Sequence, residues 1–403
     1  MKSQQPRLIV YCSLFPSSVQ PNAGVFIRER LFKVGQHCPI VVVSPVPWFP
    51  FQNLLRRFKP GFRPQPPRYE NQKGVDVYFP RFFSVPGFLK NLDGFFMALG
   101  SMLTLYKLKK SFVFNIIDAH FAYPDGYAAT LLGRWFKVPV TITLRGTEVP
   151  LSNMPGRKKR LLEALADATK IFSVADSLKR HVVSLGAQND KIEVIGNGVD
   201  TDKFHPVDRL KARERFALPE NAKVLISIGG LVDRKGYHRV IEVLPALLNE
   251  FPDLIYIIVG GASPEGNNRH FLEQQTASLN VSDHVRFLGP LPSDELKYPL
   301  SAADVFVLAT ANEGWANVFL EAMACGLPVV TTDVGGNKEV VNDDNLGEIV
   351  SFGNPTELQE ALSKALNKNW NKNSIIDYAK QNAWQTRVDR LVTIFQGVIE
   401  DKQ

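Results

Sequence analysis

Two glutamates with a spacing that suits ligand binding, Glu313 and Glu321, lie eight residues apart in the second half of the chain. The apolar runs at 304–309 and 328–332 on either side of them are typical of buried strands, and residues 316–325 have the composition of a short helix. The pattern predicts a unit of strand, turn, helix and strand, which crosses over right-handedly in a parallel sheet. Glu313 then follows the first strand, at the sheet edge where open α/β sheets bind ligands, and Glu321 lies on the helix.

The helix start beside these glutamates could hold an anion. The first backbone amides of a helix, here those of Trp315 to Val318, have no partner within the helix and suit a phosphate or another acceptor. Carboxylates suit sugar hydroxyls, so the segment offers groups for both a sugar and a phosphate. A solvated helix end with two incidental glutamates is the alternative interpretation.

A second loop at a strand end carries two cations. A strand is expected to end at Gly229 and a helix to begin near Gly236, with Arg234 and Lys235 between them. Two cations at this edge can neutralise a diphosphate and stabilise a leaving group that gains negative charge. An ordinary charged surface loop is the alternative. A further glycine pair at 335–336 follows another strand and forms either a backbone nest or a tight turn.

The first half of the chain offers a matching set of loops. Gly24 lies at a strand-to-helix turn, where a glycine lets the backbone approach a ligand closely. His120 directly follows the strand predicted at 115–119, and Arg145 and Glu148 follow the next strand. We therefore expect these three side chains at one edge of the first sheet. A structural role is the alternative for the lone histidine and for the lone turn glycine.

Composition excludes several classes of protein. The chain has 403 residues, 45% hydrophobic and 22% charged, which is typical of a soluble globular protein and long enough for two domains. Its three cysteines are widely spaced and fit a reducing cytoplasm rather than a disulfide framework. The sequence has neither the His/Cys spacing of a metal site nor the glycine-rich phosphate loop that ends in Lys and Ser or Thr. We therefore expect no metal and no cofactor.

The positive charge of the chain, +7 at pH 7, gathers in the first half, in clusters at 56–59, 107–110 and 157–160. A solvated surface, nucleic-acid binding and attraction to an anionic membrane are the alternatives, and aromatic residues beside the first two clusters favour the membrane over nucleic acid. No run approaches the roughly 18 to 20 apolar residues that span a bilayer, and the start lacks the features of a signal peptide. We expect a cytoplasmic protein that can attach peripherally to the inner face of the membrane.

Strands and helices alternate along both halves of the sequence, which predicts an α/β fold of two Rossmann-like domains, each with a doubly wound parallel sheet. A turn signal at 197–200, followed by a polar stretch, indicates the linker, so the domains are expected at 1–204 and 205–383. The segment 48–80 is rich in Pro, Phe and Arg and has the composition of an insertion or a mobile loop.

Taken together, these segments resemble the retaining nucleotide-sugar glycosyltransferases of family 4, over nearly the whole chain. The specific part is the paired-glutamate motif with AMACGLPVV at 322–330 and the Arg-Lys-Gly loop at 234–236. The segments 15–26 and 144–148 are most similar to the branch that makes bacterial surface polysaccharides, including teichuronic-acid enzymes. The resemblance implies a GT-B fold, with two domains facing across a cleft and a final helix at 384–403 that packs back on the first domain.

The resemblance also implies a role for each matching residue. Glu321 would bind the ribose hydroxyls of the donor, and Glu313 would contact the transferred sugar. Arg234 and Lys235 would hold the diphosphate, and His120 would touch the transferred sugar near the reaction centre. The remaining positions implied in donor binding are Gly24, Gly230, Gly314, Ala316, Asn317 and Val318.

Two departures from the family pattern affect these roles. Gly230 stands where many relatives have an arginine, so one phosphate cation is missing, and our hypothesis is that Arg234 substitutes for it. Arg145 stands where many relatives have a histidine, which leaves the roles of Arg145 and Glu148 on the acceptor side open.

From this resemblance we expect a retaining glycosyltransferase that moves a sugar from a nucleotide diphosphate sugar to a glycan or lipid-linked acceptor in bacterial surface polysaccharide synthesis. Nucleic acid is not expected as a partner. The alternatives are a sugar-nucleotide epimerase of the same architecture and a non-catalytic binding protein of a polysaccharide assembly. A dinucleotide-dependent oxidoreductase is disfavoured, because no Gly-x-Gly-x-x-Gly follows the first strand of either domain.

Overall fold

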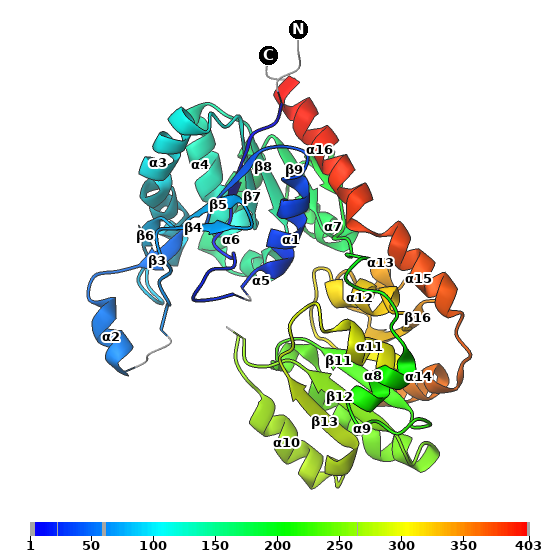
Figure 1. Ribbon diagram of the computed structural model, residues 1–403. Coiled ribbons are helices and arrows are strands. Elements are labelled where there is room, and N and C mark those ends of the chain that lie inside the picture. Colours follow the sequence, from blue (N-terminus) through cyan, green and yellow to red (C-terminus); the bar gives the residue numbers. More distant parts are fainter. Residues whose placement is uncertain (1–4, 22, 59–61, 264, 401–403) are drawn as a thin grey trace. The chain divides into compact units, whose positions relative to one another are not determined.

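The computed structural model describes residues 5–21, 23–58, 62–263 and 265–400, which divide into two compact units (Figure 1). Unit 1 is formed by residues 1–196 and 384–403, and unit 2 by residues 197–383. Each unit is built around a largely parallel sheet whose central strands are buried along their whole length, as expected where helices cover both faces.

The described part of unit 1 contains an eight-stranded sheet with the order β10-β9-β8-β7-β1-β2-β5-β4. All neighbours pair in parallel except β4 and β5, which are antiparallel. The strands are β1 (Leu8–Tyr11), β2 (Ile40–Val43), β4 (Tyr69–Gln72), β5 (Val75–Tyr78), β7 (Ile116–His120), β8 (Val140–Leu144), β9 (Lys170–Ser173) and β10 (Ile192–Val194). A separate parallel pair is formed by β3 (Val46–Trp48) and β6 (Arg81–Phe83).

Helices cover both faces of this sheet. Leu8 and Val10 of β1 pack in one buried cluster with α1 and α16, whereas the Tyr11 hydroxyl bonds to Ser101 of α3 on the other face, at 2.8 Å. The helices are α1 (Val25–Val34), α2 (Gln52–Phe58), α3 (Asp93–Ser111), α4 (Tyr127–Phe136), α5 (Glu148–Ser152), α6 (Pro155–Asp167), α7 (Asp176–Ser184) and α16 (Trp384–Glu400), with short helical turns η1 (Lys90–Leu92), η2 (Ala122–Gly126) and η3 (Asn189–Lys191).

Of the two alternatives for 48–80, an insertion or a mobile loop, the loop is wrong for 52–58, 69–72 and 75–78. This segment contains α2 and the hairpin of β4 and β5, which adds two strands to the main sheet. Val77 of β5 is fully buried beside β2, and the turn at Lys73-Gly74 has positive φ at both residues, as two-residue hairpins require. The many prolines and arginines around these short strands hid their alternating pattern.

Unit 2 contains, among its described residues, a six-stranded parallel sheet with the order β13-β12-β11-β14-β15-β16. The strands are β11 (Val224–Ile228), β12 (Ile255–Val259), β13 (Val285–Gly289), β14 (Val305–Leu308), β15 (Val329–Thr332) and β16 (Gly347–Val350). The helices are α8 (Arg209–Arg215), α9 (Tyr237–Glu250), α10 (Arg269–Ser278), α11 (Lys297–Ala302), α12 (Asn317–Ala324), α13 (Asn337–Val340), α14 (Pro355–Asn367) and α15 (Lys372–Gln381), with turns η4 (Asp233–Lys235) and η5 (Ser282–His284).

Residues 197–204 belong to unit 2, although they were expected in the first domain. Val199 forms a parallel bridge with Ala383, and its amide donates to the Asn382 carbonyl at 3.1 Å. Phe204 is buried in the core formed by α12, α15 and β11. These contacts tie the turn to the second core, because both apolar side chains would otherwise be exposed to water.

The chain returns to unit 1 through α16, the helix labelled at the upper right of Figure 1 and coloured red. Its buried stripe packs against α1, and the ring of Phe395 lies 5.7 Å from that of Phe172 on β9 in an edge-to-face contact. Among the described residues, no helix has both the length and the apolar character that crossing a membrane demands.

The burial of Phe395 generates a stability prediction. Phe395→Ala should lower the free energy of unfolding by about 3–5 kcal/mol, because it removes a buried ring and leaves a cavity between α16 and the sheet. Denaturant unfolding measures this loss. Thr393→Ala, an exposed position on the same helix, is the control and should change the value by less than about 0.5 kcal/mol. Equal effects of the two substitutions would contradict the packing of α16 on unit 1.

Candidate functional site

The strand order of each sheet creates a point where the direction of chain progression reverses. In unit 2 this point lies between β11 and β14, because the chain runs outward from β11 to β13 and then from β14 to β16. In unit 1 it lies between β1 and β7. Ligands of open α/β sheets bind outside the carboxyl ends of the strands at such a point. The loops after β11 and β14 are those that carry Arg234, Lys235 and Glu313.

These three predicted side chains meet in unit 2. Lys235 Nζ lies 2.5 Å from Glu313 Oε1, and Arg234 Nη1 lies 3.2 Å from the same oxygen. Lys235 and Glu313 are largely buried, with side-chain exposures of 14% and 10%. The prediction that the two loops lie at one sheet edge is correct, because they follow two strands, β11 and β14, that are parallel neighbours in the sheet.

A second carboxylate, Glu265 in the loop after β12, holds the outer side of Arg234. Arg234 Nε and Nη2 donate to its two carboxylate oxygens at 2.6 and 2.8 Å, in a bidentate pair. This hydrogen bonding from Glu265, with the charge of Glu313, raises the pKa of Arg234, and Arg234 in turn lowers the pKa of Glu265. The orientation of the guanidinium is therefore fixed by two carboxylates, those of Glu265 and Glu313. The sequence contained a weak signal for Glu265, because it lies in a glycine-rich loop after a strand.

Two glycines shape the backbone around this cluster. Gly335 has φ 55°, and a Cβ atom there would lie 1.7 Å from the Glu313 carbonyl oxygen. Gly236 has φ 76°, and its Cβ would lie 1.9 Å from the Ala309 carbonyl oxygen. Only glycine fits either place. The glycine pair at 335–336 thus brings the loop after β15 against Glu313, and the Gly336 amide donates to the Glu313 carbonyl at 3.3 Å.

The start of α12 lies on the same loop as Glu313. Gly314 precedes it, Ala316 is its N-cap residue, and the helix begins at Asn317. Asn317 Oδ1 accepts a hydrogen bond from Asn197 Nδ2 at 2.8 Å, so the side chain of Asn317 is held within unit 2. Glu321 lies one turn further along, and its charge, after burial, contributes to raising the pKa of Cys325 to about 12.

Two buried donors beside the cluster are without a hydrogen-bond partner and were not predicted. Among the described residues, these are the Tyr237 hydroxyl at the start of α9 and the Trp315 indole nitrogen before α12. Burial and the charges of Tyr256 and Glu313 raise the pKa of Tyr237 well above its usual value. A bound polar group is the usual partner for such donors. Periodicity alone could not single them out, because both positions read as core residues.

His120 and Arg145 of unit 1 also meet, as predicted, at the edge next to the point of reversal. Arg145 Nε donates to His120 Nδ1 at 3.1 Å, and Asp118 Oδ2 lies 3.5 Å from His120 Nε2. The histidine ring is fully buried, and burial with the charges of Arg145 and Arg30 lowers its pKa well below the usual value. His120 is therefore neutral at physiological pH, and its Nδ1 is occupied by the hydrogen bond from Arg145.

Glu148 has a structural role in unit 1. Its carboxylate accepts hydrogen bonds from the backbone amides of Ala122, Arg145 and Gly146, at 3.1, 3.2 and 2.8 Å. These amides belong to the loops after β7 and β8, so one buried carboxylate ties the two loops together. Glu148 therefore holds the two loops together, and these hydrogen bonds account for its burial without a direct contact to a ligand.

The remaining predicted glycines have distinct environments. Gly24 is the N-cap of α1 with φ 67°, and a Cβ there would lie 2.2 Å from the Leu14 carbonyl oxygen. Its loop is thus folded tightly on the end of β1. Gly230 follows β11, where a Cβ would lie 3.0 Å from Ser263 Cβ. A larger side chain at 230 would therefore need Ser263 to give way slightly.

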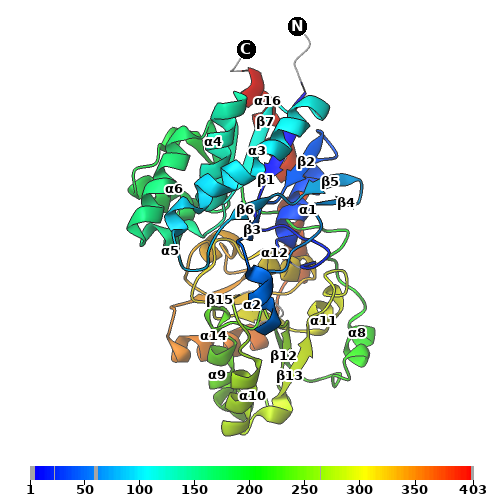
Figure 2. The ribbon, with the colours of Figure 1, turned by 90° about the vertical axis from the view of Figure 1, so that its left-hand side faces the viewer.

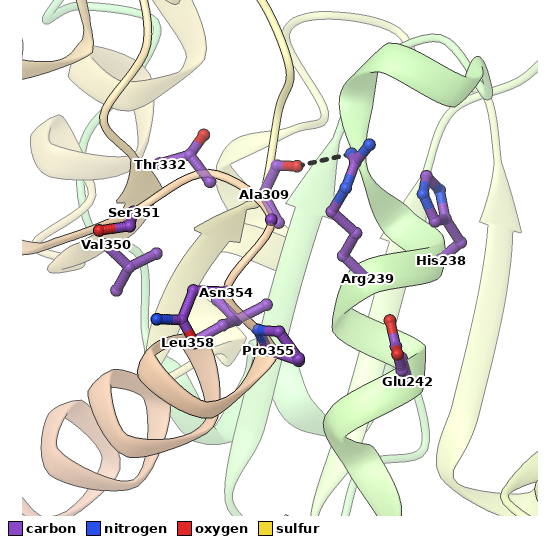
Figure 3. Close-up of a pocket in the computed structure, with 11 residues that line it drawn as sticks. His238, Arg239, Glu242, Ala309, Thr332, Val350, Ser351, Asn354, Pro355 and Leu358 are labelled. Atoms are coloured by element: carbon purple, nitrogen blue, oxygen red, sulfur yellow. Dashed lines mark hydrogen bonds between the residues drawn. The ribbon is translucent and has the colours of Figure 1, made fainter.

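A pocket of about 310 Å³ lies elsewhere in unit 2, between α9 and the start of α14 (Figure 3). None of the predicted site residues lines it. Its principal cation, Arg239, donates to the Ala309 carbonyl at 3.0 Å and stacks 4.7 Å from the ring of Phe352. The guanidinium of this pocket is therefore already engaged, and the cluster at the point of reversal, which unites the predicted residues, is the better candidate site. Within the described ranges, no group of three or more His, Cys, Asp or Glu side chains could hold a metal.

Comparison with known proteins agrees with this interpretation of the fold. Residues 208–382 match the family model "Glycosyl transferases group 1", and residues 58–203 match "Glycosyltransferase Family 4". HepE of Anabaena, solved in complex with UDP, superimposes with a TM-score of 0.74 at 18% identity, over 98% of this chain and 100% of that one. The two units are thus the two Rossmann-like domains of a GT-B fold.

Two relatives extend the comparison. A Bacillus subtilis (strain 168) protein named "Putative teichuronic acid biosynthesis glycosyltransferase TuaC" is 27% identical over 336 residues, 82% of each chain. A D-inositol 3-phosphate glycosyltransferase of Corynebacterium urealyticum is 30% identical over 306 residues, 71% of this chain and 72% of that one. The chain belongs to the glycosyltransferases of group 1 and family 4.

The buried acids of unit 1 generate a prediction about pH. Burial raises the pKa of Asp118 to about 6 and that of Asp125 to about 7, against about 3.9 for an unfolded chain. Between pH 4 and 7 the folded state therefore binds more protons than the unfolded state, so these groups make stability fall as pH rises through that window. Asp125→Asn should flatten the fall and raise the free energy of unfolding at pH 8 by an amount on the order of 2 kcal/mol.

Denaturant unfolding from pH 5 to 8 tests this effect. Ser13, which bonds to Asp125 through its amide and hydroxyl, can keep both contacts with the amide side chain. Asp190→Asn, an exposed position in the same unit, is the control and should follow the unmodified protein. A pH profile of Asp125→Asn that coincides with that of the unmodified protein would contradict the raised pKa.

Proposed function

We propose that this glycosyltransferase moves a sugar from a nucleoside diphosphate sugar to a glycan or lipid-linked acceptor, with retention of anomeric configuration, in bacterial surface polysaccharide synthesis. The observation that carries the proposal is the cluster of Arg234, Lys235 and Glu313 at the point of strand-order reversal in unit 2. It combines two cations for a diphosphate with a carboxylate for a hydroxyl. The adjacent start of α12 adds backbone amides for phosphate or sugar oxygens.

The donor class is supported from two sides. HepE, which shares the fold, was solved with UDP, a nucleoside diphosphate. In this chain, Glu313 lies in the loop before α12 and Glu321 lies one turn into that helix. In this proposal the two carboxylates bind opposite ends of one extended donor. In this proposal Glu321 binds the ribose hydroxyls and Glu313 the transferred sugar, with Lys235 and Arg234 at the diphosphate between them.

The reaction follows from these positions. The bond between the anomeric carbon and the phosphate oxygen breaks, and the departing diphosphate gains negative charge, which Lys235 and Arg234 stabilise. The acceptor hydroxyl attacks from the same face, and its proton passes to an oxygen of the departing phosphate. The new bond therefore forms on the face that the old one left, which retains the configuration.

Two rearrangements accompany donor binding in this proposal. Arg234 is bound to Glu265 through Nε and Nη2, so contact of these donors with a phosphate requires Arg234 to share or exchange that carboxylate. His120 is fully buried and its Nδ1 accepts a hydrogen bond from Arg145, so its contact with the transferred sugar requires the guanidinium to move away. The approach of the Gly24 loop to the donor remains part of the same proposal.

The donor cluster generates a prediction about activity. Lys235→Ala and Glu321→Ala should each reduce transfer by about 100-fold or more, because each removes a group that holds the donor. Both variants should keep their unfolding midpoint within a few degrees. Lys364→Ala, an exposed lysine of α14, is the control and should retain full activity. Assays with a panel of nucleotide sugars, after a thermal-shift screen for the stabilising nucleotide, measure the effect; near-normal turnover by either site variant refutes these roles.

The stereochemistry and the epimerase alternative share one experiment. Proton NMR of the product formed with acceptor should show the anomeric configuration of the donor, since attack and departure share one face. Without acceptor, the donor sugar should remain unepimerised. An inverted product overturns the retaining mechanism, and a new sugar nucleotide formed without acceptor supports the epimerase instead.

A further inference from the structure

The outer face of α3 in unit 1 is apolar for three turns. Phe95, Leu99, Leu103 and Tyr106 follow one another at intervals of four, four and three residues, so they share one side of the helix. All four are exposed, and Leu103 has 74% of its surface in water. A helix face of a soluble protein that points to water is normally polar. This one carries no charged residue between Gly94 and Tyr106.

Neighbouring segments widen this face. Phe83 at the end of β6 and Phe88 and Leu89 before η1 are also exposed. The rings of Phe83 and Phe96 lie 5.4 Å apart, and those of Phe95 and Phe96 lie 5.8 Å apart, so the aromatic side chains join into one surface. Contiguous apolar patches of this kind on a protein surface mark interaction sites.

The short helix α2 adds a second exposed apolar element. Phe51 and Phe58, before and at the end of this helix, are 86% and 84% exposed, and Leu54 and Leu55 between them are exposed as well. Figure 2 shows α2 and α3 on the side of unit 1 that faces the viewer, and Figure 1 shows both on its left. The two elements therefore lie on the same side of unit 1.

The charges around these elements are mostly positive. Segments 45–68 and 77–117 together contain ten basic residues and one acidic residue, Asp93. Their net charge, +9, is larger than the net charge of +7 of the whole chain. Asp93 is paired with Lys90 at 3.0 Å. Lys107 and Lys110 are exposed at the end of α3, and Lys110 lies 4.6 Å from the ring of Tyr106. Arg57 is exposed on α2.

From this combination we propose that α2 and the exposed face of α3 form a peripheral binding surface for an anionic lipid bilayer. Aromatic and leucine side chains enter the boundary between headgroups and acyl chains, and the flanking cations bind anionic headgroups. An acidic protein partner would match the charge, but the long apolar stripe with aromatic side chains at its rim matches the graded polarity of a bilayer surface. The surface lies on unit 1 and is independent of the donor cluster.

Sedimentation of the full chain with vesicles tests the proposal. The protein should bind vesicles of phosphatidylcholine with 30–40% phosphatidylglycerol (roughly the charge density of an anionic leaflet) and should bind pure phosphatidylcholine about tenfold more weakly. Raising the salt from about 0.1 to about 1 M shortens the screening length from about 10 to about 3 Å, so binding should fall with it. Trp48, half exposed beside α2, should shift its fluorescence to shorter wavelength on binding.

Matched variants localise the surface. Leu103→Glu, and the double change Lys107→Glu with Lys110→Glu, should each weaken binding about tenfold or more. The controls are Leu210→Glu and Lys211→Glu on α8 of unit 2, which make the same kinds of substitution at exposed positions, the lysine control at one position instead of two. Both controls should bind as the unmodified protein does, and all variants should keep their unfolding midpoint and their stabilisation by nucleotide.

Three outcomes overturn the proposal. The first is the absence of binding to phosphatidylglycerol vesicles at low salt. The second is equal loss in Leu103→Glu and Leu210→Glu, which would mean that any added charge acts. The third is self-association that Leu103→Glu abolishes in the absence of lipid binding, measured by light scattering, which would assign the face to a second copy of the chain.

Discussion

The ion pair between Lys235 and Glu313 depends on the order of the strands in unit 2. The two residues are 78 apart in the sequence, yet their side-chain atoms lie 2.5 Å apart because β11 and β14 are neighbours in the sheet. A largely buried ion pair costs desolvation energy, and replacing one partner leaves a charge that must find another. Here Arg234 adds a second cation and Glu265 a second carboxylate, so an anionic ligand must compete with two carboxylates for Arg234 and Lys235.

The corresponding edge of unit 1 has a different balance. His120, Asp118 and Arg145 are buried there, and Glu148 is spent on three backbone amides. At this edge Glu148 holds two loops together, and a neutral, buried histidine accepts a hydrogen bond from the guanidinium of Arg145. The two domains thus share a topology and differ in chemistry, because the same strand ends carry two cations paired with two carboxylates in one and a buried polar network around a histidine in the other.

Most helices and strands could be predicted because they are long, apolar and bounded by turns. The strand predicted at 115–119 is β7 (Ile116–His120), and the helix predicted at 316–325 is α12 (Asn317–Ala324). The hairpin of β4 and β5 was missed because only one face of it is buried and its strands have four residues each. Short elements of this kind are stabilised by pairing with a sheet that the local sequence does not reveal.

By itself, the sequence determined the class of fold and which loops carry the charged groups, because both follow from local periodicity and from residue type at strand ends. Only the tertiary structure decided which groups meet. Three contacts join segments that are distant in sequence. They are the bidentate pair of Glu265 and Arg234, the close approach of Gly335 to the Glu313 carbonyl, and the hydrogen bond from Arg145 to His120. Such contacts depend on strand order and on close packing between loops, neither of which has a local signature in the sequence.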